Sequence, residues 1–154
     1  ILPDFNLLGF NYRMTDLQGA IGLVQLKKMD SFIDERAKWA KWYLDELRTI
    51  EWLILPKEPV NGRHGWQSFV TYVDPDKAPV ARNELMNKLQ QHGVSTRPGT
   101  HAVHMLGLYQ ESCGLKPDDF PGARDCDVNT MAIPLHNRMT KEDYEYVVNA
   151  LKSF

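Results

Sequence analysis

The sequence predicts an α+β fold, in which a long N-terminal helix precedes a small sheet that helices cover on one face. The first indication is residues 17–47, where apolar side chains recur mostly every three or four positions, as in an amphipathic helix. The second is a series of short runs rich in β-branched and aromatic residues, which predict strands and are separated by further helical stretches. With 154 residues, 43% of them hydrophobic, the chain is long enough to bury one core.

Residues 1–14 form an irregular apolar lead-in, and the long helix begins after Thr15. The lead-in has no nearby partner strand, so we expect its large apolar side chains to pack on something outside the chain. These side chains are Phe5, Leu7, Leu8, Phe10 and Tyr12. Thr15 followed by Gln18 fits a capping box. About 35 residues is long for one globular helix, so we expect a kink or break near Asp30 and Ser31.

Strands and shorter helices alternate over the rest of the chain. Strands are expected at 52–55, 66–73, 94–97 and 131–135, and helices at 80–92, at 122–129 and from Thr140 onward. Gly93 stands where a glycine commonly ends a helix, and Thr140 with Asp143 fits a second capping box. Residues 100–121 are expected to be mostly irregular, with one helical turn over 105–111, and ordered loops of this length are often functional.

We expect two units, a lead-in with a long linking helix over 1–50 and a small α+β domain over 51–154. The chain begins with Ile1 rather than methionine, which predicts that it is part of a longer protein.

The charge and the cysteines restrict the class of protein. A formal net charge of −2 argues against a general nucleic-acid binder and against a polybasic membrane surface. No apolar run approaches the 18 residues typical of a membrane-spanning helix. Cys113 and Cys126 do not form a CxxC pair, so we expect free, buried thiols in a reducing compartment, the cytoplasm.

The lead-in holds the first group of candidate site residues. Asn11 offers an amide that can donate to a phosphate oxygen, and Arg13 offers a planar guanidinium for an anion. Tyr12 would line the same pocket. Each has a structural alternative: Asn11 as a turn residue ahead of the helix, Arg13 in an ion pair with Asp16, and Tyr12 in core or interface packing.

A second polar cluster follows the strand at 94–97. It contains Arg97, Thr100, His101 and His104, and the alternative is that the histidines are hydrogen-bonded loop residues. The two histidines also raise the possibility of zinc, with further ligands from Cys113, Cys126 or His136. Their spacing matches no standard zinc site, so we expect no metal.

Residues 9–26, GFNYRMTDLQGAIGLVQL, resemble a motif of the DegT/DnrJ/EryC1/StrS family. The members are pyridoxal-phosphate (PLP) sugar aminotransferases of fold-type I, which is the aspartate aminotransferase-like fold. Weaker similarities follow in the family's order and extend the resemblance over nearly the whole chain: Arg36, Tyr43 and Leu47, then 66–70, 82–89, 93–94, 132–136 and 139–143.

The resemblance implies the C-terminal small domain of an enzyme that transfers an amino group from glutamate or glutamine to a keto-sugar nucleotide. Such reactions serve polysaccharide or cell-surface sugar biosynthesis. It also implies a homodimer and a missing N-terminal PLP domain. The family's Schiff-base lysine, its pyridine-stacking aromatic residue and its ring-nitrogen aspartate precede the motif at 9–26 and are not in this sequence. The isolated chain is therefore expected to be inactive.

The resemblance also implies roles for individual residues. The motif's asparagine, here Asn11, reaches across the dimer interface to the neighbouring subunit's PLP phosphate. Arg13 is a second candidate cofactor contact because of its guanidinium, not because of the resemblance. The loop after the strand at 94–97 approaches the active site, which makes Arg97 and His101, with Tyr12, candidates for binding a diphosphate or a sugar hydroxyl. In this loop the family more often has a tyrosine after the first histidine.

Other functions are compatible with the same residues. One is a non-catalytic α+β interaction or regulatory module with an aminotransferase-like shape, which predicts a start codon close upstream of Ile1 and a folded product without PLP. A zinc hydrolase using the two histidines would contain metal. A dehydratase of the same family would differ at the position of the missing lysine.

Overall fold

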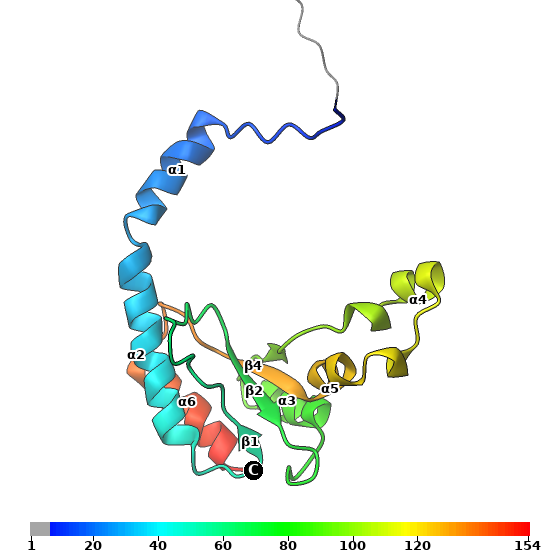
Figure 1. The fold of residues 1–154 in the computed structure, drawn as a ribbon. Coiled ribbons are helices and arrows are strands. Elements are labelled where there is room, and N and C mark those ends of the chain that lie inside the picture. Colours follow the sequence, from blue (N-terminus) through cyan, green and yellow to red (C-terminus); the bar gives the residue numbers. More distant parts are fainter. Residues whose placement is uncertain (1–6) are drawn as a thin grey trace, which may run out of the picture.

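The computed structural model describes residues 7–154, so Phe5 of the lead-in lies outside the described part. Figure 1 shows a chain that curves like an open letter C. The lead-in and helix α1 (Asp16–Leu26) form one arm, a short helical segment around α4 (Gly107–Cys113) forms the other, and the sheet lies between them at the base. The lead-in, with the first group of candidate site residues, is therefore held away from the sheet, where β3 carries Arg97.

The long helical stretch is divided into α1 and α2 (Met29–Leu47). The Thr15 capping box is confirmed, with the Thr15 hydroxyl accepting from the Gln18 backbone N–H. The expected break exists, but it lies at Lys27 and Lys28 rather than at Asp30 and Ser31. Ser31 fits inside the first turn of α2 because its hydroxyl donates to the Lys28 carbonyl at 2.8 Å.

The sheet has four antiparallel strands in the order β1-β2-β4-β3. They are β1 (Leu53–Ile54), β2 (Phe69–Val73), β4 (Thr130–Ile133) and β3 (Arg97–Pro98). The expected strand at 94–97 is shorter and shifted, since only the last of its residues pairs with β4 and Pro98 continues the pairing. Proline is tolerated there because β3 is an edge strand and one side needs no N–H donor.

One face of the sheet carries the core. Along β2 the side chains of Phe69, Thr71 and Val73 are buried, whereas those of Val70 and Tyr72 are half-buried on the opposite face. The buried face packs against α2, α3 (Arg82–Gln91) and α6 (Lys141–Lys152) in one hydrophobic cluster. This confirms the predicted α+β layer, with helices on one face of the sheet. Because Tyr43 and Leu47 of α2 belong to the same cluster, the linking helix contributes to the domain core.

The segment expected to be mostly irregular is largely helical. It contains η1 (Val103–Met105), α4, which overlaps the helical turn expected over 105–111, and η2 (Pro117–Asp119). The helix expected at 122–129 is confirmed as α5 (Pro121–Asn129). These helices are too short to show an apolar stripe, and α4 ends at Gly114 in the left-handed conformation that glycine favours (φ 65°). The cysteines are free as expected, but both are exposed rather than buried, because they lie on these peripheral helices.

The lead-in and α1 are apolar and exposed. No residue of α1 is buried, and Phe10 in the lead-in is 85% exposed. Among the helices described in residues 7–154, none is both long and apolar enough to cross a membrane. Whether this arm packs on another polypeptide stays a prediction, as does the division of the chain at residue 50.

Buried tyrosines give the fold a dependence on alkaline pH. Burial raises the pKa of Tyr144 to about 12, and it raises the pKa of Tyr43 as well. An unfolded tyrosine ionises near pH 10, so the stabilisation is fully present below pH 10 and is lost as the pH rises toward 12. We expect the free energy of unfolding to fall by about 3 kcal/mol between pH 8 and pH 11, with about half of the fall from each tyrosine. Urea unfolding at pH 8 and pH 11 measures it. Tyr144→Phe should weaken the dependence, whereas the same change at exposed Tyr146 should leave it intact.

Candidate functional site

Asn11 is held in a turn just ahead of α1. Its side-chain Oδ1 accepts the backbone N–H of Arg13 at 3.0 Å, which is the turn that short polar residues form before a helix. The structural alternative for Asn11 is therefore present, and it leaves the amide nitrogen Nδ2 without an acceptor among residues 7–154. Asn11, Tyr12 and Arg13 are all exposed. Within the described chain Arg13 forms no ion pair with Asp16 or any other carboxylate.

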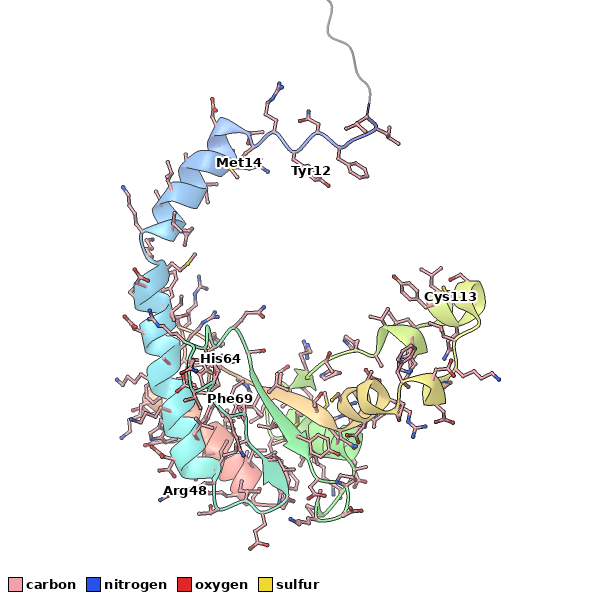
Figure 2. All side chains as sticks on the ribbon, in the orientation of Figure 1. Tyr12, Met14, Arg48, His64, Phe69 and Cys113 are labelled. Atoms are coloured by element: carbon pink, nitrogen blue, oxygen red, sulfur yellow. The ribbon has the colours of Figure 1, made fainter. Side chains whose placement is uncertain are left out.

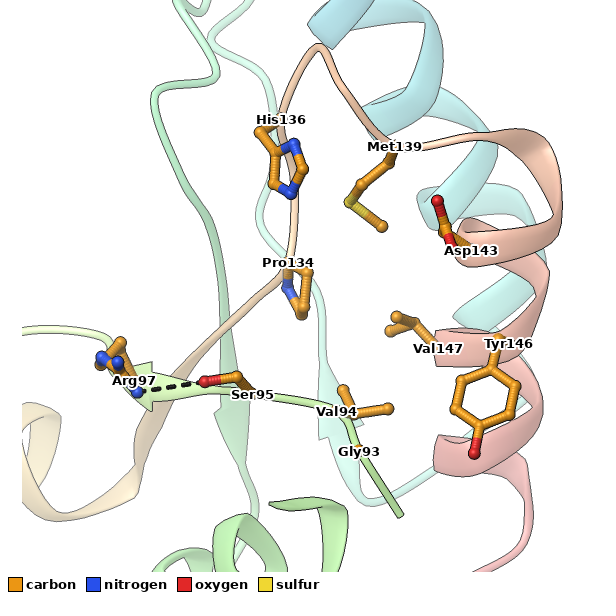
Figure 3. A pocket seen from close by; sticks show the side chains of 10 residues that line it. All are labelled: Gly93, Val94, Ser95, Arg97, Pro134, His136, Met139, Asp143, Tyr146 and Val147. Carbon is orange, nitrogen blue, oxygen red and sulfur yellow. Dashed lines mark hydrogen bonds between the residues drawn. The ribbon is translucent and has the colours of Figure 1, made fainter. Parts of the chain in front are cut away.

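Arg97 lies on the face of the sheet opposite the core. It is paired with Ala132 of β4, which is itself paired with Val70 of β2, so the three side chains share that face. The Arg97 guanidinium Nη1 donates to the Ser95 hydroxyl at 3.2 Å and to the Thr96 carbonyl at 2.9 Å. The first of these bonds is visible in Figure 3. The remaining donors of this exposed guanidinium are directed toward solvent or a ligand.

The loop after β3 begins with a close approach of two backbones. Gly99 donates its N–H to the Thr130 carbonyl at 3.0 Å. A Cβ at this position would lie 2.5 Å from the Val70 side chain and 2.6 Å from the Thr130 hydroxyl, closer than atoms can pack. Only glycine therefore lets the chain turn so tightly over the sheet and carry Thr100 and His101 onto its open face.

The two histidines of this loop have different surroundings. His104 is buried, its Nε2 lies 3.1 Å from the Pro117 carbonyl, and its ring contacts Phe120. His101 is exposed, and its Nδ1 lies 3.6 Å from Oδ1 of Asp127. His104 thus fits the alternative of a hydrogen-bonded loop residue, whereas His101 is accessible to a ligand. Among residues 7–154 no group of three or more histidine, cysteine, aspartate or glutamate side chains is placed to hold a metal ion.

A buried arginine supports this loop, a role that the sequence analysis did not predict. Arg82, at the start of α3, donates from Nε to the Val128 carbonyl at 2.8 Å and from Nη2 to the Asp127 carbonyl. Burial lowers the pKa of the guanidinium, and the nearby Asp127 carboxylate opposes that effect. Arg82 and Asp127 are 45 positions apart, so only the tertiary structure joins them.

A groove of about 560 Å³ lies between the segment leading into β3 and helix α6 (Figure 3). Ser95 and Arg97 line one side, and Met139, Asp143 and Val147 line the other. It adjoins Arg97 but does not include His101, so it is not the site at which the loop residues converge.

The lead-in and the β3 loop do not meet within one chain. The lead-in lies at the far end of α1, well separated from β3 in Figure 1, and Figure 2 shows Tyr12 on the opposite arm from Cys113. Arg97 lies in β3 and His101 in the loop that follows it, whereas Asn11, Tyr12 and Arg13 form a separate, exposed group.

Comparison with known proteins identifies relatives of the whole chain. The model of the DegT/DnrJ/EryC1/StrS aminotransferase family matches residues 4–152. The spore coat polysaccharide biosynthesis protein SpsC of Bacillus subtilis is 34% identical over 145 residues, which are 94% of this chain and 37% of that protein. GDP-perosamine synthase of Caulobacter vibrioides is 30% identical over 148 residues, 96% of this chain and 39% of that protein.

A solved structure supports the same fold. The PLP form of Spr1654 from Streptococcus pneumoniae superposes with a TM-score of 0.81 at 20% identity, over 91% of this chain and 35% of that one. The chain thus spans about two fifths of the length of the curated relatives it matches. Because the family model covers nearly every residue, from the lead-in to the last helix, the chain belongs to the DegT/DnrJ/EryC1/StrS aminotransferase family.

Proposed function

We propose that this chain is the C-terminal small-domain part of a PLP-dependent aminotransferase. The complete enzyme would transfer an amino group from glutamate or glutamine to a keto-sugar nucleotide for polysaccharide or cell-surface sugar biosynthesis. The observation that carries the proposal is the family match over residues 4–152, in a chain that spans 37–39% of its relatives. We also propose a cytoplasmic location, because unpaired cysteines are typical of proteins in a reducing compartment.

The residues of the lead-in fit a phosphate group. The turn at Asn11 uses Oδ1 and leaves Nδ2 free to donate, and Arg13 supplies an exposed guanidinium two residues later. PLP, when bound, supplies the electron sink for the transfer, while the protein binds and orients it. Asn11 and Arg13 would hold the cofactor phosphate, and Tyr12 would line the same pocket.

The separation of the two groups of residues supports a homodimer. Asn11 lies on an exposed arm, away from Arg97 and His101 of its own chain. A second copy would allow the lead-in of one subunit to contribute to the site of the other, as the family resemblance implies. Arg97 and His101 would then bind the diphosphate or a hydroxyl of the sugar nucleotide from the open face of the sheet. The N-terminal PLP domain of each subunit would complete the site.

Replacing Asn11 tests this assignment in the longer gene product. Asn11→Ala removes one donor to the phosphate, and we expect the dissociation constant of PLP to rise about tenfold, the effect of one hydrogen bond to a charged group. Titration of the cofactor-free protein with PLP, followed by absorbance, measures it. Asn61→Ala, in an exposed loop, is the matched control and should bind PLP normally. Unchanged PLP affinity in the Asn11 variant would remove Asn11 from the site.

A further inference from the structure

Asp127 is the point where the β3 loop is attached to helix α5. Its Oδ1 accepts the backbone N–H of Ala102 at 3.2 Å and lies 3.6 Å from Nδ1 of His101. Ala102 is buried, with 3% of its surface exposed, so its N–H needs a protein acceptor. One carboxylate oxygen therefore contacts two successive residues of the loop.

The attachment is itself rigidly supported. Arg82 holds the carbonyls of Asp127 and Val128 from the core side, which fixes the end of α5 against α3. The loop is also held on both sides of Ala102, by the bond from Gly99 to Thr130 and by the contact of His104 with Pro117. Asp127 thus controls the part of the loop that carries His101.

The arrangement determines which side of the imidazole is accessible. Nδ1 faces the Asp127 carboxylate, so Nε2, on the other side of the ring, is left for a ligand, and 69% of the side chain is exposed. A carboxylate beside one ring nitrogen favours the ring orientation in which the other nitrogen points away from it.

We propose that Asp127 is a positioning residue that orients His101 and its loop for binding the sugar-nucleotide substrate. The proposal rests on the proposed function for the identity of the ligand, and it adds a residue that the family resemblance did not assign. Asp127 acts through the Ala102 amide and the His101 ring and does not touch the substrate itself.

The test uses the longer gene product with keto-sugar nucleotide and glutamate as substrates. Asp127→Ala is expected to raise KM for the sugar nucleotide about tenfold, equivalent to the loss of one charge-assisted hydrogen bond. The half-reaction with glutamate alone, followed by the absorbance of the bound cofactor, should keep its rate.

Asp127→Asn retains an acceptor for Ala102 and should restore KM to within about threefold of the unmutated value. His101→Ala should raise KM similarly, and the double variant should add nothing further.

Asp125→Ala is the matched control. Asp125 lies on the same helix but accepts from Tyr72 and Asn129 rather than from the loop, so its removal should leave KM unchanged. An unchanged KM in Asp127→Ala, or an equal slowing of both half-reactions, would overturn the positioning role. Additive effects in the double variant would overturn it as well.

Hydrogen exchange at the Ala102 amide separates this proposal from the proposed function. Exchange should accelerate at least tenfold in Asp127→Ala and remain slow in Asp127→Asn, whatever the substrate of the enzyme is. If the unmutated protein binds no PLP and transfers no amino group, the proposed function fails. If Ala102 exchanges equally in both Asp127 variants and the unmutated protein, the positioning role fails.

Discussion

Residues 1–154 expressed alone are expected to bind no PLP and to show no transamination, whereas the longer gene product is expected to do both. The cofactor contacts proposed for this chain are the side chains of Asn11 and Arg13, which are both exposed. Exposed polar contacts contribute about 1 kcal/mol each, which is well short of the several kcal/mol lost when a small molecule is immobilised. The lysine that the family resemblance places upstream is needed for covalent attachment.

The measurement is the visible absorbance of PLP that remains with the protein after gel filtration. The control is the longer gene product treated in the same way, which shows that the preparation retains cofactor when the N-terminal part is present. Stoichiometric PLP on the 154-residue chain, or amino transfer by that chain, would contradict the proposal that cofactor binding and catalysis require the N-terminal PLP domain.

Replacement of Arg82 by methionine is expected to lower the free energy of unfolding by about 3 kcal/mol. Arg82 is 6% exposed, and its guanidinium donates to two carbonyls at the end of α5. Methionine is of similar length and fills much of the space, so the cost comes mainly from leaving two buried carbonyls without donors. Urea unfolding followed by tryptophan fluorescence measures the change.

Two further variants make the Arg82 result specific. Arg82→Lys keeps the charge but cannot reach both carbonyls in the same planar geometry, so an intermediate loss is expected. Arg48→Met, at the exposed end of α2, should change stability by less than about 0.5 kcal/mol. Equal stabilities of Arg82→Met and the unmutated chain would show that these bonds do not support the fold.

Local signals in the sequence located most of the secondary structure. The two capping boxes at Thr15 and Thr140 and the glycine at position 93 were confirmed because each depends on residues within a few positions of one another. The strand at 66–73 was recognisable from its own residues, although pairing begins only at Phe69. The strand at 94–97 was misplaced because its limits depend on pairing with β4, and the helix break lies three positions before the expected Asp30 and Ser31.

In the candidate site, too, some residues were identified from the sequence and others only from the structure. Asn11, Arg13, Arg97 and His101 were identified from short motifs, and their roles remain predictions. The support of the β3 loop by Arg82 and Asp127 could not be predicted, since 45 positions separate the two residues and no local pattern links them. The distinction between buried His104 and exposed His101 likewise required the structure, because three positions in a loop fix no relative orientation.

The sequence by itself determined the family, the α+β class and the limits of several helices, because motifs, caps and apolar periodicity are local properties of the chain. The tertiary structure alone decided the strand order β1-β2-β4-β3, the face of the sheet that stays open, and the residues that support the loop over it. These depend on which distant segments pack together, and that choice is made by the shared burial of side chains from α2, α3, α6 and the sheet.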